Sequence, residues 1–166
     1  MDIRQITPRY AVSPQIDPED IAAIKAAGFT TLICNRPDEE VPPSHQAAVM
    51  AEAAAAAGLA FHALPLTHQT MTQDRVAMQR DLIAGATGPV LAYCASGTRC
   101  SVVWSLGQAG HLPVDQIMQA TAQAGYDLAG LRPQLDAIAE RGGQQGRASK
   151  AGQAPHASGG GGAFAE

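Results

Sequence analysis

A chain of 166 residues is long enough for one domain with a substantial core and too short for two comfortable ones. Charged residues make up 16% of the chain and the formal net charge is −4, so the clustered Lys and Arg of a nucleic-acid-binding surface are missing. We therefore expect no nucleic-acid partner.

The N-terminal segment "MDIRQITPRYAV" lacks the basic start and long apolar run of a secretory signal, and no window approaches the length needed to span a bilayer. These features predict a cytoplasmic protein that does not interact with a membrane. The three cysteines form neither a CxxC pair nor a Cys/His cluster. We accordingly expect no disulfide framework, no metal site and no cofactor.

Short β-prone runs alternate with helix-like segments from the start of the chain. The runs "IRQI" and "YAVS" predict two strands around a turn, and residues 17–28 predict a helix with Asp17 as its N-cap. The β-branched run "TTLICN", residues 30–35, is too short for a helix and is typical of a buried strand. An alanine-rich segment then predicts a helix that ends at Gly58, with Ser44 as its cap.

The same alternation continues along the chain. "LAFHALPL" predicts a strand, Thr72 can cap a helix that follows it, and "PVLAY" predicts another strand. This order predicts an α/β fold with a mostly parallel sheet and helices on both faces. Three helical segments follow from residue 99. We expect one domain over residues 1–141 and a disordered tail over residues 142–166, which are rich in Gly, Ser, Ala and Gln.

The segment "LAYCASGTRCS", residues 91–101, holds the strongest candidate for a catalytic site. Cys94 follows a predicted strand, and Arg99 opens a predicted helix after four intervening residues. Ligands of open α/β sheets bind outside the carboxyl ends of the strands, which places this loop at the expected site. Backbone N–H groups, the helix N-terminus and the Arg99 charge all favour the thiolate, so we expect a lowered pKa and a nucleophilic Cys94 at neutral pH.

The neighbours of Cys94 and Arg99 are the expected substrate-binding residues. Gly97 suits a tight loop because glycine tolerates positive φ. The hydroxyl groups of the loop can hold its conformation or donate to the thiolate. Cys100 could resolve an oxidised Cys94 through a disulfide, or it could simply pack in the core, and we favour packing. The full expected set is Ala95, Ser96, Gly97, Thr98, Cys100 and Ser101.

Three residues outside the loop are further candidates. Arg36 follows a buried strand and either pairs with the acidic residues after it or reaches the substrate anion, and both alternatives stay open. Asp74 is a candidate general acid, although a carboxylate at an early helical position also simply favours the helix dipole. His68 follows another strand and could line the pocket.

The segment "CASGTRCS" with the preceding "GPVLAY", together with "IRQITPRYAVSPQI" and "LICNRPDEE", resembles the bacterial beta-lactamase hydrolase-like protein, phosphatase-like domain family. The resemblance covers roughly residues 2–110 and implies a scaffold similar to that of the dual-specificity protein phosphatases. Members are variously described as sulfur transferases or phosphatases, and some are fused to a persulfide dioxygenase. Such a dioxygenase is therefore a candidate partner. Many members have Arg directly after the nucleophile, where this chain has the uncharged Ala95.

The length of the loop separates two chemistries. The cysteine phosphatase signature has five residues between Cys and Arg, whereas Cys94 and Arg99 enclose four, as in the rhodanese loop. A smaller ring of amides suits a single anionic sulfur atom, and sulfur transfer needs no general acid. We therefore predict a sulfurtransferase that passes sulfane sulfur from a small anion through a Cys94 persulfide to a thiol or cyanide acceptor.

Two alternatives remain open at this point. The first is a cysteine-dependent phosphatase that acts on a phosphate-type anion through a phosphocysteine intermediate, with Asp74 or Asp38 as the acid. The second is a non-catalytic module that binds an anion or a persulfide in the same loop.

Overall fold

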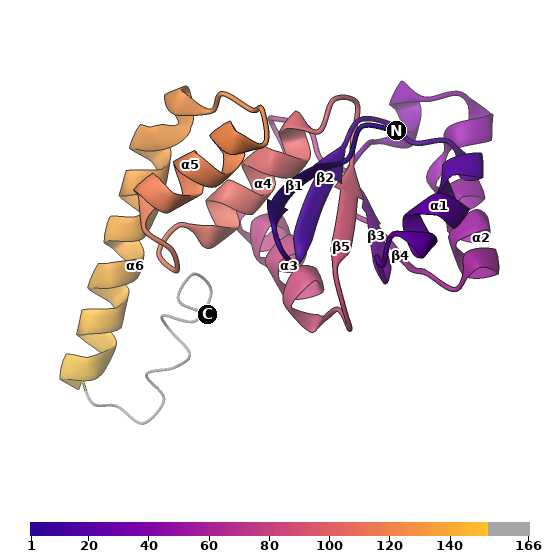
Figure 1. Cartoon of the computed structure of the whole chain (residues 1–166). Coiled ribbons are helices and arrows are strands. Elements are labelled where there is room, and N and C mark those ends of the chain that lie inside the picture. The colour runs from indigo at the N-terminus through magenta and orange to yellow at the C-terminus, as the bar shows by residue number, and fades with distance from the viewer. Residues whose placement is uncertain (153–166) are drawn as a thin grey trace. The chain divides into compact units, whose positions relative to one another are not determined.

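The computed structural model describes residues 1–152, with side chains through Gly142. The chain divides into two compact units, Met1–Val103 and a second unit that begins at Trp104. Figure 1 labels the helices and strands of both units. The loop that carries Cys94 and Arg99 lies entirely within the first unit.

A five-stranded sheet with the order β1-β2-β5-β3-β4 forms the centre of the first unit (Figure 1). Strand β1 pairs antiparallel with β2, and every other neighbouring pair is parallel. The mostly parallel sheet and the predicted strands are thus confirmed. The strands are β1 (Arg4–Thr7), β2 (Tyr10–Ser13), β3 (Thr31–Cys34), β4 (Ala60–Ala63) and β5 (Val90–Tyr93).

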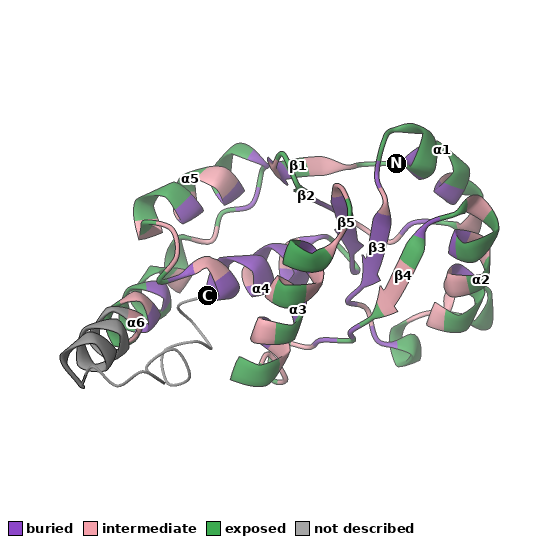
Figure 2. Ribbon diagram, turned by 90° about the horizontal axis from the view of Figure 1, so that it is seen from below, coloured by how far each residue is buried: buried purple, intermediate pink, exposed green. Residues whose placement is uncertain are grey.

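Helices cover both faces of this sheet, as the alternation of elements predicts. Helices α1 (Ile21–Ala26) and α2 (Ala47–Ala57) lie on one face, and α3 (Gln73–Gly85) and the start of α4 (Thr98–Gln108) lie on the other (Figure 2). Short 3₁₀ turns connect these elements. They are η1 (Pro18–Asp20), η2 (Asp38–Glu40) and η3 (Pro43–His45).

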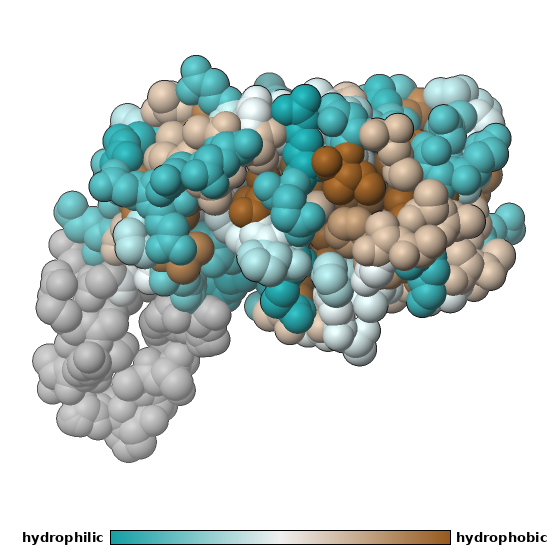
Figure 3. Space-filling view, in the orientation of Figure 1, coloured by the Kyte–Doolittle hydropathy of each residue, from teal (hydrophilic) through white to brown (hydrophobic). Residues whose placement is uncertain are grey.

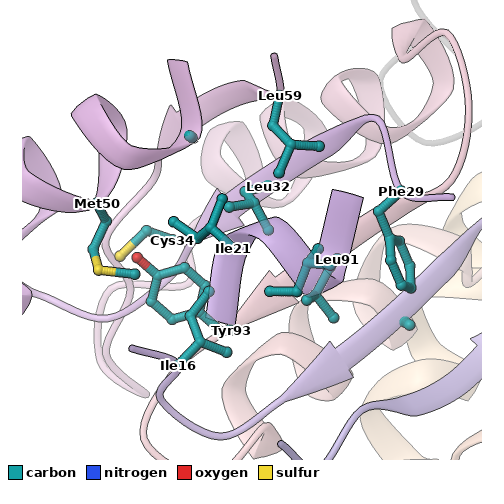
Figure 4. Packing of buried hydrophobic residues seen from close by; sticks show 12 residues of the cluster. Ile16, Ile21, Phe29, Leu32, Cys34, Met50, Leu59, Leu91 and Tyr93 are labelled. Carbon is teal, nitrogen blue, oxygen red and sulfur yellow. The ribbon is translucent and has the colours of Figure 1, made fainter. Parts of the chain in front are cut away.

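The two faces of the sheet are separated by the alternation of side chains along each strand. Leu32 of β3 and Leu91 and Tyr93 of β5 pack with Met50 of α2 in one buried cluster (Figure 4). On the opposite face, the hydroxyl group of Tyr10 donates a hydrogen bond to the carbonyl oxygen of Cys100 (2.8 Å). This bond ties β2 to the first turn of α4.

The start of α2 differs from the predicted cap. Ser44 lies in the 3₁₀ turn η3, because Pro43 begins that turn, and its hydroxyl group contacts His45 Nδ1 (2.7 Å). The backbone N–H of Ala47 donates instead to Asp38 Oδ1 (2.8 Å). A carboxylate from η2 therefore satisfies a free amide at the N-terminus of this helix.

The second unit is helical throughout its described part, which confirms the three helical segments expected after the loop. It contains the end of α4, α5 (Val114–Gln123), η4 (Ala129–Leu131) and α6 (Arg132–Gly152). Helix α6 extends to Gly152, beyond residue 141, where we expected the domain to end. The remainder of the expected tail, residues 153–166, lies outside the described residues.

Large hydrophobic side chains are rarely exposed in the described part of the chain, where Met1, Val49 and Met78 are the examples. Figure 3 shows hydrophilic side chains over much of the visible face, with strongly hydrophobic residues, coloured brown, gathered near its middle. Among the described helices, none is both long and apolar enough to cross a bilayer.

Candidate active site

Cys94 lies directly after β5, at the edge where the parallel strands end. Its backbone N–H donates to the carbonyl oxygen of Ser13 at the end of β2 (3.3 Å), and the backbone N–H of Asn35 after β3 donates to Tyr93 (2.9 Å). Three neighbouring strands therefore deliver the start of the loop to the carboxyl edge of the sheet. This is the position that the sequence predicts for the site.

The thiol group of Cys94 is surrounded by hydrogen-bond donors. Donation by the Cys100 thiol is the largest influence on its acidity, and backbone N–H groups of Cys100, Ser96 and Gly97 act in the same direction. The Gly97 N–H lies 3.1 Å from Sγ, in a loop where Gly97 adopts a φ of 91°. Although burial opposes ionisation, these donors lower the pKa of Cys94 to about 5.

Cys100 has two roles in this arrangement. Its side chain is fully buried, as the packing alternative expects. Burial raises the pKa of Cys100 well above the ordinary thiol value, and its bond to Cys94 acts in the same direction. Cys100 therefore keeps its proton and donates it in a hydrogen bond to the Cys94 thiolate. The sequence analysis missed this donor, although its position directly after Arg99 in the first turn of α4 was a usable signal.

The hydroxyl groups of the loop bond to the loop itself. Ser96 Oγ donates to Thr98 Oγ1 (2.9 Å) and accepts from the Thr98 N–H (3.3 Å), while Ser101 Oγ donates to the carbonyl oxygen of Gly97 (2.9 Å). Ala95 and Ser96 are exposed, and Ser101 is buried. The hydroxyl groups therefore hold the loop in shape.

Arg99 is held by a bidentate ion pair with Glu40. Nη1 and Nη2 contact the two carboxylate oxygens at 2.9 and 2.7 Å, and Nη1 also donates to the carbonyl oxygen of Leu66 (2.9 Å). This pairing lowers the pKa of Glu40, so the carboxylate is ionised. Among the described residues, no partner takes the Nε–H or the second Nη2 proton. The edge of the guanidinium group that carries Nε and Nη2 thus keeps two N–H donors for an oxyanion.

Arg36 also binds Glu40. Its Nε lies 3.2 Å from Glu40 Oε1, its Nη2 donates to the Glu40 carbonyl oxygen (3.2 Å), and its Nη1 donates to Gln15 Oε1 (3.4 Å). Of the two alternatives left open for Arg36, these contacts favour the structural clamp. Glu40 is the shared partner of both arginines.

Cys34 is buried beneath a separate cavity of about 300 Å³ beside the site, which Arg36 also lines. Its Sγ donates to the carbonyl oxygen of Arg36 (3.3 Å), and burial is the main reason that the pKa of Cys34 is raised. Cys34 is therefore a protonated core thiol, in contrast to Cys94.

A cavity of about 410 Å³ forms the approach to the cysteine loop. Arg99 and two residues of the loop line it from one side, and the segment after β4 lines it from the other. The lining residues are Glu40, Thr67, His68, Gln69, Ser96, Thr98 and Arg99. His68 thus lies where the sequence analysis allowed for it.

The structure does not bring the two candidate aspartates to this cavity. Asp74 is exposed, and the hydroxyl group of Thr72 donates to it (2.5 Å) and lowers its pKa. Asp38 lines the neighbouring cavity and caps α2 through the N–H of Ala47. Neither carboxylate lines the approach to Cys94.

The described residues contain no group of three or more His, Cys, Asp or Glu side chains that could hold a metal ion.

Residues 2–111 match the family described as "Beta-lactamase hydrolase-like protein, phosphatase-like domain". A beta-lactamase hydrolase-like protein of Agrobacterium fabrum is 31% identical over 126 residues, which cover 75% of this chain and 29% of that protein. A beta-lactamase hydrolase-like protein of Xylella fastidiosa is 32% identical over 132 residues, which cover 77% of this chain and 30% of that protein. The chain spans less than a third of the length of these relatives.

Solved structures show the same fold. A candidate phosphatase of Neisseria meningitidis is 37% identical with a TM-score of 0.74, covering 82% of this chain and 98% of that one. Two further structures match in fold alone. A candidate phosphatase of Shewanella putrefaciens is 20% identical with a TM-score of 0.60, covering 82% of this chain and 91% of that one. The catalytic core of the Saccharomyces cerevisiae PP-IP phosphatase SIW14 is 10% identical with a TM-score of 0.58, covering 85% of this chain and 92% of that one. The cysteine-phosphatase-like fold is confirmed, and the family match and the Neisseria meningitidis relative support the phosphatase alternative rather than the sulfurtransferase.

Proposed function

This chain belongs to the beta-lactamase hydrolase-like protein, phosphatase-like domain family, and from that premise we propose that it hydrolyses phosphate monoesters through a phosphocysteine on Cys94. One observation carries the proposal. The site combines Cys94, whose pKa of about 5 makes it a thiolate, and Arg99, whose free edge can bind two oxygens of one anion. The family and its relatives make the chain a cysteine-dependent, phosphatase-like enzyme.

In the first step, the Cys94 thiolate attacks the phosphorus atom of the bound ester. A bond forms between sulfur and phosphorus, the ester P–O bond breaks, and the electron pair leaves with the alcohol oxygen. The free edge of Arg99 and the backbone N–H groups of the loop bind the non-bridging oxygens, whose charge they stabilise as the bond order changes. Water then hydrolyses the phosphocysteine and releases inorganic phosphate and the thiolate.

Glu40 supports this reaction without contacting the phosphorus atom. Its carboxylate fixes the guanidinium plane of Arg99 through two bonds, and Arg36 fixes the carboxylate in turn. A planar fork that is already oriented loses little side-chain entropy when it binds substrate. We therefore assign Glu40 and Arg36 to positioning.

Sulfur transfer is a second candidate because the loop encloses only four residues between Cys94 and Arg99. The same thiolate would attack a sulfane sulfur and hold it as a persulfide, which a thiol acceptor would remove. A persulfide dioxygenase would be a fitting partner for that activity. If neither phosphate nor sulfur transfer occurs, the loop would act as the anion-binding module of the third alternative.

The test measures both reactions on the same purified protein. We expect release of p-nitrophenol from p-nitrophenyl phosphate, a loss of at least about 1,000-fold in Cys94→Ser, and a loss of about 10- to 100-fold in Arg99→Lys, which keeps the charge but removes the fork. Thiosulfate with cyanide is assayed in parallel. Cys94-dependent thiocyanate formation without any phosphate release would replace the phosphatase proposal with the sulfurtransferase.

A further inference from the structure

The phosphatase reaction needs a proton donor, because most alcohols are poor leaving groups as anions. The titratable side chains that line the cavity above the loop are Glu40, Arg99 and His68. Both carboxylate oxygens of Glu40 bind Arg99, and this contact lowers the pKa of Glu40, so it holds no proton to give. Arginine does not release its proton. His68 is the lining residue that remains.

His68 is carried by a turn with several internal bonds. The backbone N–H of Thr70 donates to the carbonyl oxygen of Thr67 (3.1 Å), which closes a β-turn with His68 at its second position. The N–H of Thr67 donates to Thr70 Oγ1 (2.8 Å), and Arg75 Nη1 donates to the carbonyl oxygen of Thr70 (3.1 Å). These bonds fix the backbone from which the imidazole projects.

The same segment is attached to the anion-binding arginine. The carbonyl oxygen of Leu66, two residues before His68, accepts from Arg99 Nη1 (2.9 Å), and the N–H of Leu66 donates to the carbonyl oxygen of Asn35 (2.9 Å). A substrate phosphate bound by Arg99 is therefore held against the segment that carries His68. Arg99 and His68 line the same cavity, so a phosphate bound by Arg99 would lie in the cavity that this imidazole also lines.

We propose that His68 is the general acid that protonates the leaving oxygen of the substrate, an assignment that rests on the phosphatase function proposed above. As the thiolate of Cys94 forms the S–P bond and the P–O bond breaks, imidazolium N–H donates its proton to the departing oxygen, and the alcohol leaves neutral. Neutral His68 then takes a proton from the water that attacks the phosphocysteine. The S–P bond breaks, phosphate leaves, and the thiolate and imidazolium are restored.

The charged groups that share the cavity with His68 are Glu40 from η2 and Arg99 from α4, and they are paired with each other. A general acid must carry its proton in order to act. The ratio of kcat/KM for a substrate with a poor leaving group to kcat/KM for one whose leaving group needs no proton should therefore change with pH.

The experiment compares phenyl phosphate, whose leaving group needs a proton, with p-nitrophenyl phosphate, whose leaving group is a stable anion. In His68→Gln we expect kcat/KM for phenyl phosphate to fall about 100-fold and that for p-nitrophenyl phosphate to fall less than about tenfold. The matched control is His62→Gln, because His62 lies on β4 and lines a different cavity. We expect this control to retain wild-type rates with both substrates.

Each outcome has a distinct meaning. Equal losses with the two substrates in His68→Gln would overturn the assignment of His68 as the acid while leaving the phosphatase intact. Absence of Cys94-dependent hydrolysis of either substrate by the wild-type protein would overturn the phosphatase function and the assignment together. A comparison of the wild-type protein with the two substrates is independent of any variant. A ratio of kcat/KM for phenyl phosphate to kcat/KM for p-nitrophenyl phosphate that does not change with pH would also overturn the assignment.

Discussion

Removal of the Cys100 thiol should make Cys94 markedly less acidic. The donors around Cys94 lower its pKa from about 9, the ordinary thiol value, to about 5, which corresponds to about 5 kcal/mol in favour of the thiolate. The Cys100 thiol is the largest of these influences. A hydrogen bond to a charged group contributes about 1.5–3 kcal/mol, and a change of one pH unit in a pKa corresponds to about 1.4 kcal/mol. Cys100→Ala should therefore raise the pKa of Cys94 by about one to two pH units.

The rate of alkylation by iodoacetamide as a function of pH measures this pKa directly, because the thiolate reacts and the thiol does not. Peptide mass spectrometry separates Cys94 from the other two cysteines. The wild-type rate should decline as pH falls through about 5, whereas the decline in Cys100→Ala should occur at a higher pH. Cys100→Ser is the matched control, since a hydroxyl group can still donate to the thiolate.

Two results would refute this reasoning. A wild-type inflection near the ordinary thiol value of about 9 would show that the loop does not stabilise the thiolate. An inflection that is the same in Cys100→Ala and in the wild type would show that the backbone N–H groups alone determine the acidity of Cys94.

Three further substitutions test the parts of the site. Glu40→Gln should lower kcat/KM for p-nitrophenyl phosphate by about 10- to 100-fold, because it releases Arg99. The control is Glu39→Gln, which changes a neighbouring carboxylate outside the cysteine cavity and should change kcat/KM less than about twofold. Gly97→Ala forces an L side chain into a positive φ and should cost about 1–2 kcal/mol in the free energy of unfolding, measured by urea titration. Asn35→Ala leaves buried partners unsatisfied and should cost about 2–3 kcal/mol in the same titration. A loss below about 0.5 kcal/mol would contradict the positive φ in the case of Gly97 and the side-chain bonding in the case of Asn35.

The sheet and the cysteine loop could be predicted because their signals are local. Short apolar runs bounded by Gly and Pro mark the buried strands, and a strand that leads through "CASGT" into a helix places Cys94 and Arg99 on one loop. Asp38 could not be identified as the cap of α2 in the same way. Its bond to Ala47 depends on how η2 folds back on the helix, which no local pattern records.

The wider site depends on contacts between distant residues. Glu40 and Arg99 are 59 residues apart and meet because β3 and β5 are neighbours in the sheet. Sequence reasoning considered a pairing of Arg36 with the acidic residues after it, one of which is Glu40, four residues away. It did not anticipate the contact of Glu40 with Arg99. It kept Asp74 as a candidate acid, although the early helical position of this residue already offered another explanation for a carboxylate there. The cavity is lined by His68 instead, which sequence reasoning allowed for. The preference for sulfur transfer rested on the loop length and on a reaction that needs no general acid, whereas the family match supports the phosphatase.

The central claim is that Cys94 accepts a phosphoryl group. Rapid acid quench during turnover of phenyl phosphate, followed by mass spectrometry of the peptide that contains Cys94, tests it most directly. We predict a phosphoryl adduct on Cys94 that disappears in Cys94→Ser. A peptide that never carries phosphate, but gains a sulfur atom on Cys94 when thiosulfate is supplied, would contradict the account.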